Sequence, residues 1–354
     1  MRIRYFILIF AALMAFASCG EKKKKSYDEI AMSGLTTRTE NLKTNLKAFA
    51  NKGTLIGQMY GTLSGIGWNR WECDSDHCDM KALCGYRPAA NGYELAGIES
   101  GKQQNADGVP FNAIREDVLN HFRKGGLIFM NWTMPNYNGN EDLLEEYAHQ
   151  LAKYLDTLQD GYGIKAPVVL HLLPLDGKAW YCQLSKEDYI DLYKKLQSLL
   201  EDEEVTNVVY GYSETYQPGR QLMDRYPDHH IDVINVTYYQ YKSAIDLPLY
   251  QKNIQTIIAQ TLPFAQEHNN AFGLTTGIES IGDSSVFSDI LLPEFKQHHI
   301  AYLMMGRNQG EPIQEHYFTP YPGVENAKVH GFMKLVNDDI TVFLEKLNGL
   351  YLEH

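Results

Sequence analysis

The stretch GIKAPVVLHLLPLDGKAW, residues 163–180, opens on a glycine, continues as a nearly unbroken apolar run and ends in a polar loop. A short apolar run bounded by turn residues is typical of a parallel strand that is covered on both faces. Such a strand usually delivers a catalytic group at its end, yet this one reaches Pro174 and Leu175 where an acid is expected. The stretch therefore predicts a buried strand and raises the question of whether the protein has an active site.

The same alternation of a short apolar run and an amphipathic segment occurs eight times along the chain. The predicted strands span residues 54–61, 89–97, 127–133, 166–174, 207–213, 231–239, 271–279 and 300–308. Helical patterns lie between them, with apolar residues every three or four positions, at residues 141–158, 186–200 and 249–268. Eight strand–helix units predict an α/β protein with a single-domain (β/α)8 TIM barrel. An open doubly wound sheet is the alternative, although no G-x-G-x-x-G follows the first strand to support its dinucleotide-binding form.

Composition limits the class of partner. The chain has 354 residues, of which 44% are apolar and 21% charged, as in a globular protein with a sizeable core. The 32 Lys and Arg residues face 44 Asp and Glu residues, and a net charge of -12 repels a polyanion. We therefore expect no nucleic acid partner. We also expect no cofactor and no metal.

The first residues predict export and an anchor. Residues 1–18 combine two arginines, an apolar run too short to span a bilayer and small residues before Cys19, as in a secretory signal. The ending Ala-Ser-Cys resembles the lipobox of bacterial lipoproteins, whose cysteine becomes the lipidated N-terminus. We expect a signal peptide over 1–18, a lipidated Cys19 with a charged tether over 19–45, and the barrel over 46–354. This predicts a lipid-anchored protein of the bacterial cell envelope, on its periplasmic or outer-membrane face.

Four further cysteines must be explained in a compartment where thiols oxidise. Their positions are Cys73, Cys78, Cys84 and Cys182. The spacing of the first three matches no zinc pattern, so a disulfide involving two of these loop cysteines is favoured over a metal site. The pairing stays open among three connectivities.

The ends of the predicted strands carry many aromatic residues and few acids. Active sites of (β/α)8 barrels lie at these ends, and aromatic rings there suit sugars, whose C–H faces stack on them. Some of these rings are expected to belong to the core, Tyr93 among them. The predicted ligand contacts are Trp68, Trp132, Trp180, Tyr181, Tyr239, Arg307 and Asn308.

Six segments together resemble glycoside hydrolase family 26, the bacterial endo-β-mannanase family of (β/α)8 barrels. In order they are GTLIGQMYGTLSGIGW, PAANGYELAGIE with NADGVPF, GGLIFMNW, RYPDHHIDVINVTYY, GLTTGIESI, and GRNQ with HYFTPYPG. The resemblance runs over nearly all of residues 50–345. It implies a β-linked, mannan-like oligosaccharide or polysaccharide as partner and a role in polysaccharide utilisation.

The resemblance fails at the positions that carry the chemistry. Retaining enzymes of the family need two carboxylates about 5 Å apart. Register with Trp180 places Leu175 at the acid/base position, and register with Gly277 places Thr275 at the nucleophile position. A leucine carries no proton, and a threonine without a neighbouring base is a poor nucleophile. Other polar positions of the family are replaced too, by Thr133, His171 and Thr237.

These departures predict a mannanase-like barrel that binds a β-linked glycan without cleaving it. A working endo-β-mannanase-type hydrolase with relocated acids is the alternative, because Asp176, Glu214 and Glu279 follow predicted strands. Glu214 with Glu279 is the pair considered for that role. A third alternative is a scaffold that contacts other envelope proteins.

Overall fold

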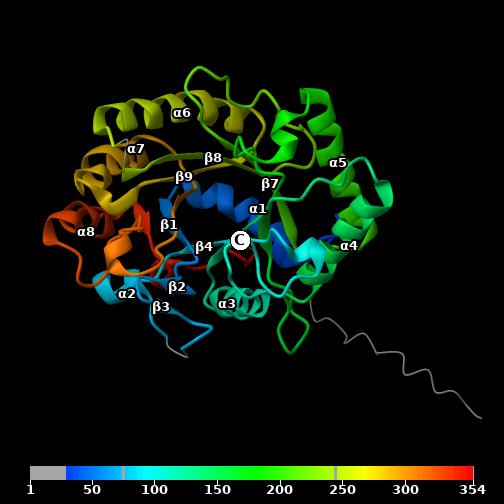
Figure 1. The fold of residues 1–354 in the computed structure, drawn as a ribbon, viewed down its shortest axis with the longest axis horizontal. Helices are drawn as coiled ribbons and strands as arrows, with labels where there is room; N and C mark the ends of the chain where they lie inside the picture. Colours follow the sequence, from blue (N-terminus) through cyan, green and yellow to red (C-terminus); the bar gives the residue numbers. More distant parts are fainter. Residues whose placement is uncertain (1–28, 74–75, 243–244, 354) are drawn as a thin grey trace, which may run out of the picture.

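The computed structural model describes residues 29–73, 76–242 and 245–353, in which eight parallel strands close into a barrel (Figure 1). Each strand pairs with the next along the chain, and β10 pairs with β1 to close the ring. The barrel strands are β1 (Thr54–Met59), β4 (Ala90–Glu94), β5 (Leu127–Trp132), β6 (Val168–Leu172), β7 (Val208–Thr215), β8 (Val233–Gln240), β9 (Ala271–Ile278) and β10 (Tyr302–Met305). The predicted single (β/α)8 barrel is confirmed.

Helices surround the strands (Figure 1). They are α1 (Thr37–Ala50), α2 (Asp79–Cys84), α3 (Phe111–Arg123), α4 (Glu141–Asp156), α5 (Lys186–Asp202), α6 (Leu247–Glu267), α7 (Leu292–Gln297) and α8 (His330–Val336). Side-chain caps start the three longest: Asn140 accepts the N–H of Leu143 in α4, and Ser185 and Asp246 cap α5 and α6 in the same way. These three helices match the predicted patterns to within a few residues.

Shorter elements complete the fold. A hairpin of β2 (Ser64–Gly65) and β3 (Trp68–Asn69) follows β1, and β11 (Thr341–Val342) pairs with β1. The 3-10 turns Trp180–Gln183 and Glu279–Ile281 lie in the loops after β6 and β9. Among the residues described, none of the helices has the length and apolar character to cross a bilayer.

The lower half of the barrel is a packed core. Val169, Val209 and Val233 are buried in one cluster inside the ring of strands. Higher up, a Cβ on Gly273 would lie 1.9 Å from the ring of Tyr302, so only glycine leaves room for that phenol. Side chains therefore fill the interior near the starts of the strands, and a cavity can form only near their ends.

Helix α1 lies in a segment that was predicted to be a tether. Its N-cap is Thr36, and it buries Leu42, Leu46 and Phe49. The backbone N–H of Thr36 donates to the carbonyl of Thr206 at 2.9 Å, just before β7, so α1 covers the end of the barrel where strands begin. The folded part thus starts before residue 46, because the buried side chains of α1 pack against the barrel. The signal segment and Cys19 lie outside the described residues.

All four described cysteines are free thiols, so the predicted disulfide is absent from the structure. Cys78 is the buried N-cap of α2 and Cys84 is its last residue. Six residues of helix separate their Cα atoms by about 9 Å, beyond the reach of a disulfide. Exposed Cys73 instead donates to the carbonyl of Asn69 at 2.8 Å. Within the residues described, no group of His, Cys, Asp and Glu side chains is arranged as a metal site.

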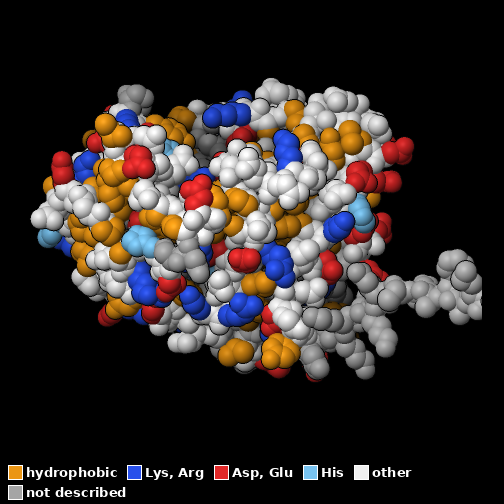
Figure 2. Space-filling model, turned by 60° about the horizontal axis from the view of Figure 1, so that its bottom comes forward, with side chains coloured by type: hydrophobic (Ala, Val, Ile, Leu, Met, Phe, Trp, Pro, Cys, Tyr) orange, Lys and Arg blue, Asp and Glu red, His pale blue; other side chains and the backbone are white. Residues whose placement is uncertain are grey.

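The face shown in Figure 2 carries side chains of both charges. Acidic and basic side chains of the described residues are interspersed there, with hydrophobic side chains among them. A nucleic-acid-binding face would instead gather Lys and Arg into a stripe or patch.

Candidate functional site

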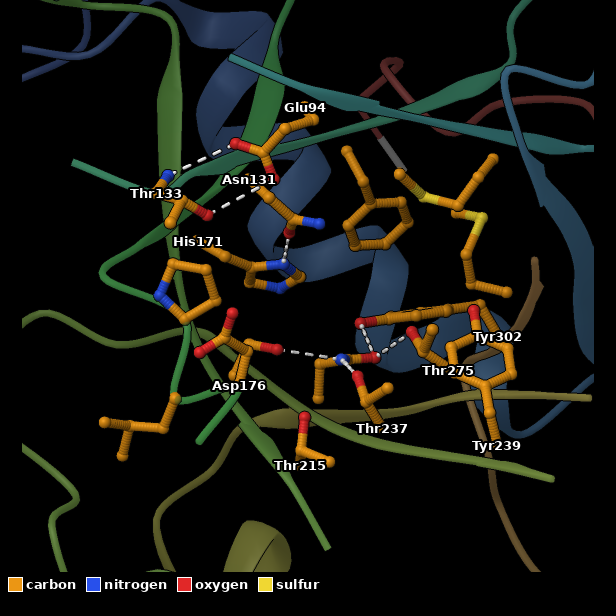
Figure 3. Close-up of a pocket in the computed structure, with 17 residues that line it drawn as sticks. Glu94, Asn131, Thr133, His171, Asp176, Thr215, Thr237, Tyr239, Thr275 and Tyr302 are labelled. Atoms are coloured by element: carbon orange, nitrogen blue, oxygen red, sulfur yellow. Dashed lines mark hydrogen bonds between the residues drawn. The ribbon is translucent and has the colours of Figure 1, made fainter. Parts of the chain in front are cut away.

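A cavity of about 250 Å³ opens where the barrel strands end (Figure 3). All eight strands or the loops after them contribute to its wall, as expected for the site of a (β/α)8 barrel. The lining residues are Met59, Glu94, Phe129, Asn131, Thr133, His171, Pro174, Leu175, Asp176, Ser213, Thr215, Asn235, Thr237, Tyr239, Thr275, Tyr302 and Met304. We call this cavity the cleft.

The floor of the cleft is an uncharged hydrogen-bond network that includes Thr237, Thr275 and Tyr302 (Figure 3). Asn235 lies at its centre. The side-chain oxygen of Asn235 accepts from the hydroxyls of Thr275 at 2.8 Å and Tyr302 at 3.1 Å. Its amide nitrogen donates to Ser213 Oγ at 3.0 Å and Thr237 Oγ1 at 3.3 Å. These bonds hold several hydroxyl groups in fixed positions on the floor.

His171 adds an acceptor without a partner. Its Nδ1 lies 2.9 Å from the side-chain oxygen of Asn131, which can only accept, so Nδ1 carries the proton. Burial lowers the pKa of His171 to about 3, and the ring is neutral at physiological pH. Nε2 is therefore an unprotonated acceptor, and it has no hydrogen-bond partner in the described part of the chain although His171 is only 3% exposed. The atom is closed off from solvent and lies against β7, where a Cβ on Gly211 would stand 2.7 Å from it. His171 therefore acts on the cleft through its bond to Asn131, which lines the wall.

Glu94 brings a carboxylate to the cleft from the end of β4. Its Oε1 accepts the backbone N–H groups of Leu95 at 3.1 Å, Ala96 at 3.0 Å and Thr133 at 3.2 Å. Hydrogen bonds of this kind favour the charged form, but burial is the larger effect and raises the pKa of Glu94 to about 7.

Asp176 is the second carboxylate of the cleft wall and lies at its exposed rim. Its Oδ1 accepts the backbone N–H groups of Lys178 at 2.7 Å and Ala179 at 2.8 Å. Its carboxylate therefore stabilises the turn after β6.

The structure brings Leu175 and Thr275, the two predicted replacement positions, to the wall of the same cleft. Leu175 extends β6 beyond its regular end, because its N–H donates to the carbonyl of Ser213 and its carbonyl accepts from Thr215, both at 2.8 Å. The side chain of Leu175 is apolar, and the hydroxyl of Thr275 donates its hydrogen bond to Asn235.

The acids predicted as substitutes do not meet in the cleft. Side chains alternate along β7, so Ser213 and Thr215 line the cleft while Glu214 points away from it. Oε1 of Glu214 accepts the N–H of Met223 at 2.6 Å, and burial raises the pKa of Glu214 to about 7. Glu279, in the turn after β9, is not part of the cleft wall and pairs with His316 at 2.6 Å.

Two predicted stacking residues belong to the core, which corrects the expectation for them. Trp132 is 0% exposed, and its indole N–H donates to Glu99 at 3.1 Å. Its neighbours Asn131 and Thr133 face the cleft, so strand alternation turns Trp132 outward. Tyr181 is also fully buried, and its hydroxyl donates to the carbonyl of Pro174 at 3.2 Å.

Trp180 is partly buried and supports the loop after β6. Its indole N–H donates to the carbonyl of Met134 at 3.0 Å. Its ring meets Tyr137 and Tyr181 edge-on, each with ring centroids 5.7 Å apart. Trp180 is absent from the cleft wall, so in this structure it shapes the loop next to the cleft.

Trp68 and Arg307 lie together in a different pocket, of about 330 Å³. The indole N–H of Trp68 donates to Asp79 at 2.7 Å. The guanidinium of Arg307 lies over the ring of Tyr60, 4.6 Å from its centroid. The structure therefore separates these two predicted contacts from the cleft.

Asn308 is fully buried and fixes the loop after β10, which corrects its predicted role in binding. Its amide nitrogen donates to the carbonyl of Thr319 at 3.0 Å, and its oxygen accepts the N–H groups of Phe318 at 3.0 Å and Thr319 at 3.2 Å. Its amide is occupied by the backbone of this loop.

Tyr239 is the predicted aromatic contact that does line the cleft. Its ring lies 5.0 Å from that of Phe318 and 6.3 Å from that of Tyr241, centroid to centroid. Tyr241 is 53% exposed, so these three rings form an aromatic edge beside the cleft.

Sequence reasoning missed Asn235 and Tyr302 on the floor and Tyr241 beside it. It placed Glu94 at the end of a strand but gave it no role in the site. Asn235 and Tyr302 sit within strands and look like core residues. The useful signal was a polar Asn inside the apolar run VINVTYY, because a buried amide in a barrel strand needs partners near the site.

No family sequence model and no curated protein sequence matches the chain. Solved structures do match it. The GH26 β-mannanase BoMan26A from Bacteroides ovatus is 27% identical, with a TM-score of 0.82, covering 90% of this chain and 98% of that one. The catalytic domain of the GH26 endo-β-1,4-mannanase from Bacillus sp. JAMB-750 is 18% identical, with a TM-score of 0.76, covering 94% and 97%.

A third match is the β-mannanase from a symbiotic protist of the termite Reticulitermes speratus, complexed with gluco-manno-oligosaccharide. It is 15% identical, with a TM-score of 0.60, and the match covers 88% of this chain and 94% of that one. Together these structures establish a mannanase-like GH26 fold for the chain.

Proposed function

We propose that the cleft of this mannanase-like barrel binds a β-linked, mannan-like glycan and does not cleave it. The solved structures of similar fold are β-mannanases, and one of them holds a gluco-manno-oligosaccharide. Sites of (β/α)8 barrels lie at the carboxyl ends of the strands, which supports the cleft as the place where this chain meets its ligand.

The observation that carries the proposal is the pair Leu175 and Thr275 in the cleft wall. Glycoside hydrolysis needs two carboxyl groups, about 5–5.5 Å apart in retaining enzymes or about 6.5–9.5 Å apart in inverting ones. At the two positions where the family resemblance places them, the side chains here cannot supply a nucleophile or a proton.

The remaining lining suits a neutral sugar. The floor offers hydroxyl and amide groups around Asn235, Asn131 adds an amide to the wall, and Tyr239 offers a ring for stacking. One or two ring contacts of about 1 kcal/mol each and a few hydrogen bonds give only modest affinity after ordering costs. We expect dissociation constants in the micromolar to millimolar range.

Calorimetry with manno-oligosaccharides tests the proposal. The wild type is expected to bind, and Tyr239→Ala is expected to weaken binding about tenfold through loss of the stacking ring. The control is Tyr162→Ala, because Tyr162 is 70% exposed in the turn before β6, at the other end of the barrel. Failure of every β-linked glycan to bind, or equal binding by Tyr239→Ala and the wild type, contradicts the proposal.

A second candidate is a hydrolase that uses Glu94, which the pKa of about 7 and the position in the cleft favour as a proton donor. Asp176 is the other carboxylate of the cleft wall. This candidate predicts release of new reducing ends from mannan by the purified wild type, abolished by Glu94→Gln or Asp176→Asn. The same assay on Glu214→Gln and Glu279→Gln checks the acids suggested by the sequence.

A further inference from the structure

A second pocket adjoins the cleft, and we call it the side pocket. It measures about 550 Å³ and lies between the loop after β6 and the loop after β7. Leu175 and Thr215 line both cavities, so the two meet at these residues. A ligand in the cleft therefore has open space on one flank, beside the very position where an acid is missing.

The wall of the side pocket carries side chains with unused hydrogen-bonding groups. Gln183, Gln217, Arg220 and Gln221 line it, and their side chains make no hydrogen bond to the residues that the structure describes. A Cβ on Gly177 would lie 2.7 Å from the amide nitrogen of Gln217, so Gln217 reaches across from one loop to the other. Three amides and one guanidinium are thus available as donors and acceptors around one cavity.

The charges of the wall balance. Glu214 and Asp224 stand against Arg220 and Arg225. Three of the four are already engaged within the protein. Glu214 accepts the N–H of Met223 at 2.6 Å, Arg225 donates to the carbonyl of Cys182 at 3.1 Å, and Asp224 pairs with Lys186 at 3.5 Å. A pocket with this lining attracts neither anions nor cations strongly, and its amides suit a neutral group rich in hydroxyls.

We propose that the side pocket receives a neutral sugar branch carried by the glycan whose main chain lies in the cleft. This inference rests on the function proposed above. The cleft lies over the ends of all eight strands, whereas the side pocket opens on its flank between two loops. A branch leaves the main chain sideways and can enter this flank while the main chain keeps its place.

Calorimetry with matched ligands tests the branch site. The probes are a linear manno-oligosaccharide, the same main chain with one galactosyl branch, and the same main chain with one glucuronosyl branch. Two or three hydrogen bonds from the side pocket predict that the wild type binds the galactosyl form about 5- to 10-fold more tightly than the linear form. In the double variant Gln217→Ala/Gln221→Ala this gain is expected to disappear while binding of the linear form is unchanged.

Gln297→Ala is the control, because Gln297 is an exposed glutamine at the end of α7, on the opposite side of the barrel (Figure 1). It is expected to keep the gain, and thermal unfolding checks that all variants are folded. Equal binding of the linear and galactosyl forms by the wild type overturns the branch site and leaves the proposed function intact. Two other results also overturn the branch site. One is tighter binding of the glucuronosyl form than of the galactosyl form, and the other is a gain in affinity for longer linear chains that is lost when Gln217 is replaced. If no probe binds, the proposed function fails and the branch site fails with it.

Discussion

Two opposing effects set the protonation state of the Glu94 carboxyl group in the cleft. Three backbone N–H groups favour its charged form, and removal from water favours the protonated form. Removal from water dominates, since the pKa is raised to about 7. Near neutral pH the cleft therefore exists in two protonation states, and ligand hydroxyls meet either a donor or an acceptor at this position.

The raised pKa of Glu94 predicts how stability depends on pH. Between its ordinary pKa of 4.5 and about 7, the folded state binds more protons at Glu94 than the unfolded state does. The free energy of unfolding therefore falls as pH rises through this window, by on the order of 3 kcal/mol at about 1.4 kcal/mol per pH unit.

Glu94→Gln is expected to remove that fall, measured by urea denaturation at pH 5 and pH 8. Glu214, with a pKa of about 7, keeps its own share of the decline in the same window. Glu267→Gln at the exposed end of α6 is the control and should behave like the wild type. A Glu94→Gln protein that declines as steeply as the wild type contradicts this role of burial.

His171 provides a prediction for binding. His171→Phe keeps a ring of similar shape and removes the Nδ1 donor that fixes the amide of Asn131 in the cleft wall, so affinity for a manno-oligosaccharide is expected to fall about 2- to 10-fold. The measurement is calorimetric titration of both proteins. His149→Phe on the surface of α4 is the matched control, because it changes the same residue type far from the cleft. Unchanged affinity in His171→Phe contradicts a role for the His171–Asn131 pair in binding.

At the scale of elements, the sequence was informative about which segments form strands and less so about which way their side chains point. All eight predicted strands are present, because continuous apolar runs between turn residues are the signature of buried parallel strands. Trp132 and Glu214 were misplaced for one reason: each is the outward residue between two inward ones. Period-two alternation gives the direction of each side chain only when one inward residue is known. Both faces of a barrel strand are buried, so the apolar pattern does not identify the inward face.

The site was predictable only in part for a related reason. Leu175, Thr275 and Tyr239 were assigned to the cleft correctly, through register with residues of a known family pattern. Asn235 lies inside β8 and Tyr302 is the first residue of β10, and sequence patterns predict core at both positions. Only the closure of the barrel brings their polar atoms to one floor.

Helix α1 supplies a prediction at this scale. Leu42 is fully buried, although it lies within the segment expected to be a tether. Leu42→Ala is expected to lower the free energy of unfolding by about 2–5 kcal/mol, because the substitution leaves a cavity under the barrel. Met32→Ala, at a fully exposed side chain, should change it by less than about 0.5 kcal/mol. Equal stability of the two variants by urea denaturation contradicts a structural role for α1.

For the whole molecule, we propose that Cys19 carries a lipid that holds the barrel at the cell envelope. The lipobox-like sequence before Cys19 supports this, and both lie outside the described residues. Cys19→Ser is expected to move the protein from the membrane to the soluble fraction of fractionated bacterial cells, because acyl chains supply the membrane affinity. The control is Cys73→Ser, which changes an exposed cysteine of the barrel. Unchanged partitioning of Cys19→Ser contradicts the anchor.

The central claim is that this barrel holds a glycan and leaves it intact, and one proton NMR experiment on a manno-oligosaccharide mixed with the purified protein tests both halves. Saturation transfer from protein to sugar protons reports contact, and the anomeric signals of reducing ends report cleavage in the same sample. With Leu175 and Thr275 in the cleft, the account predicts clear transfer and reducing-end signals that stay constant overnight. Absence of transfer contradicts binding, and growth of the reducing-end signals shows an active hydrolase.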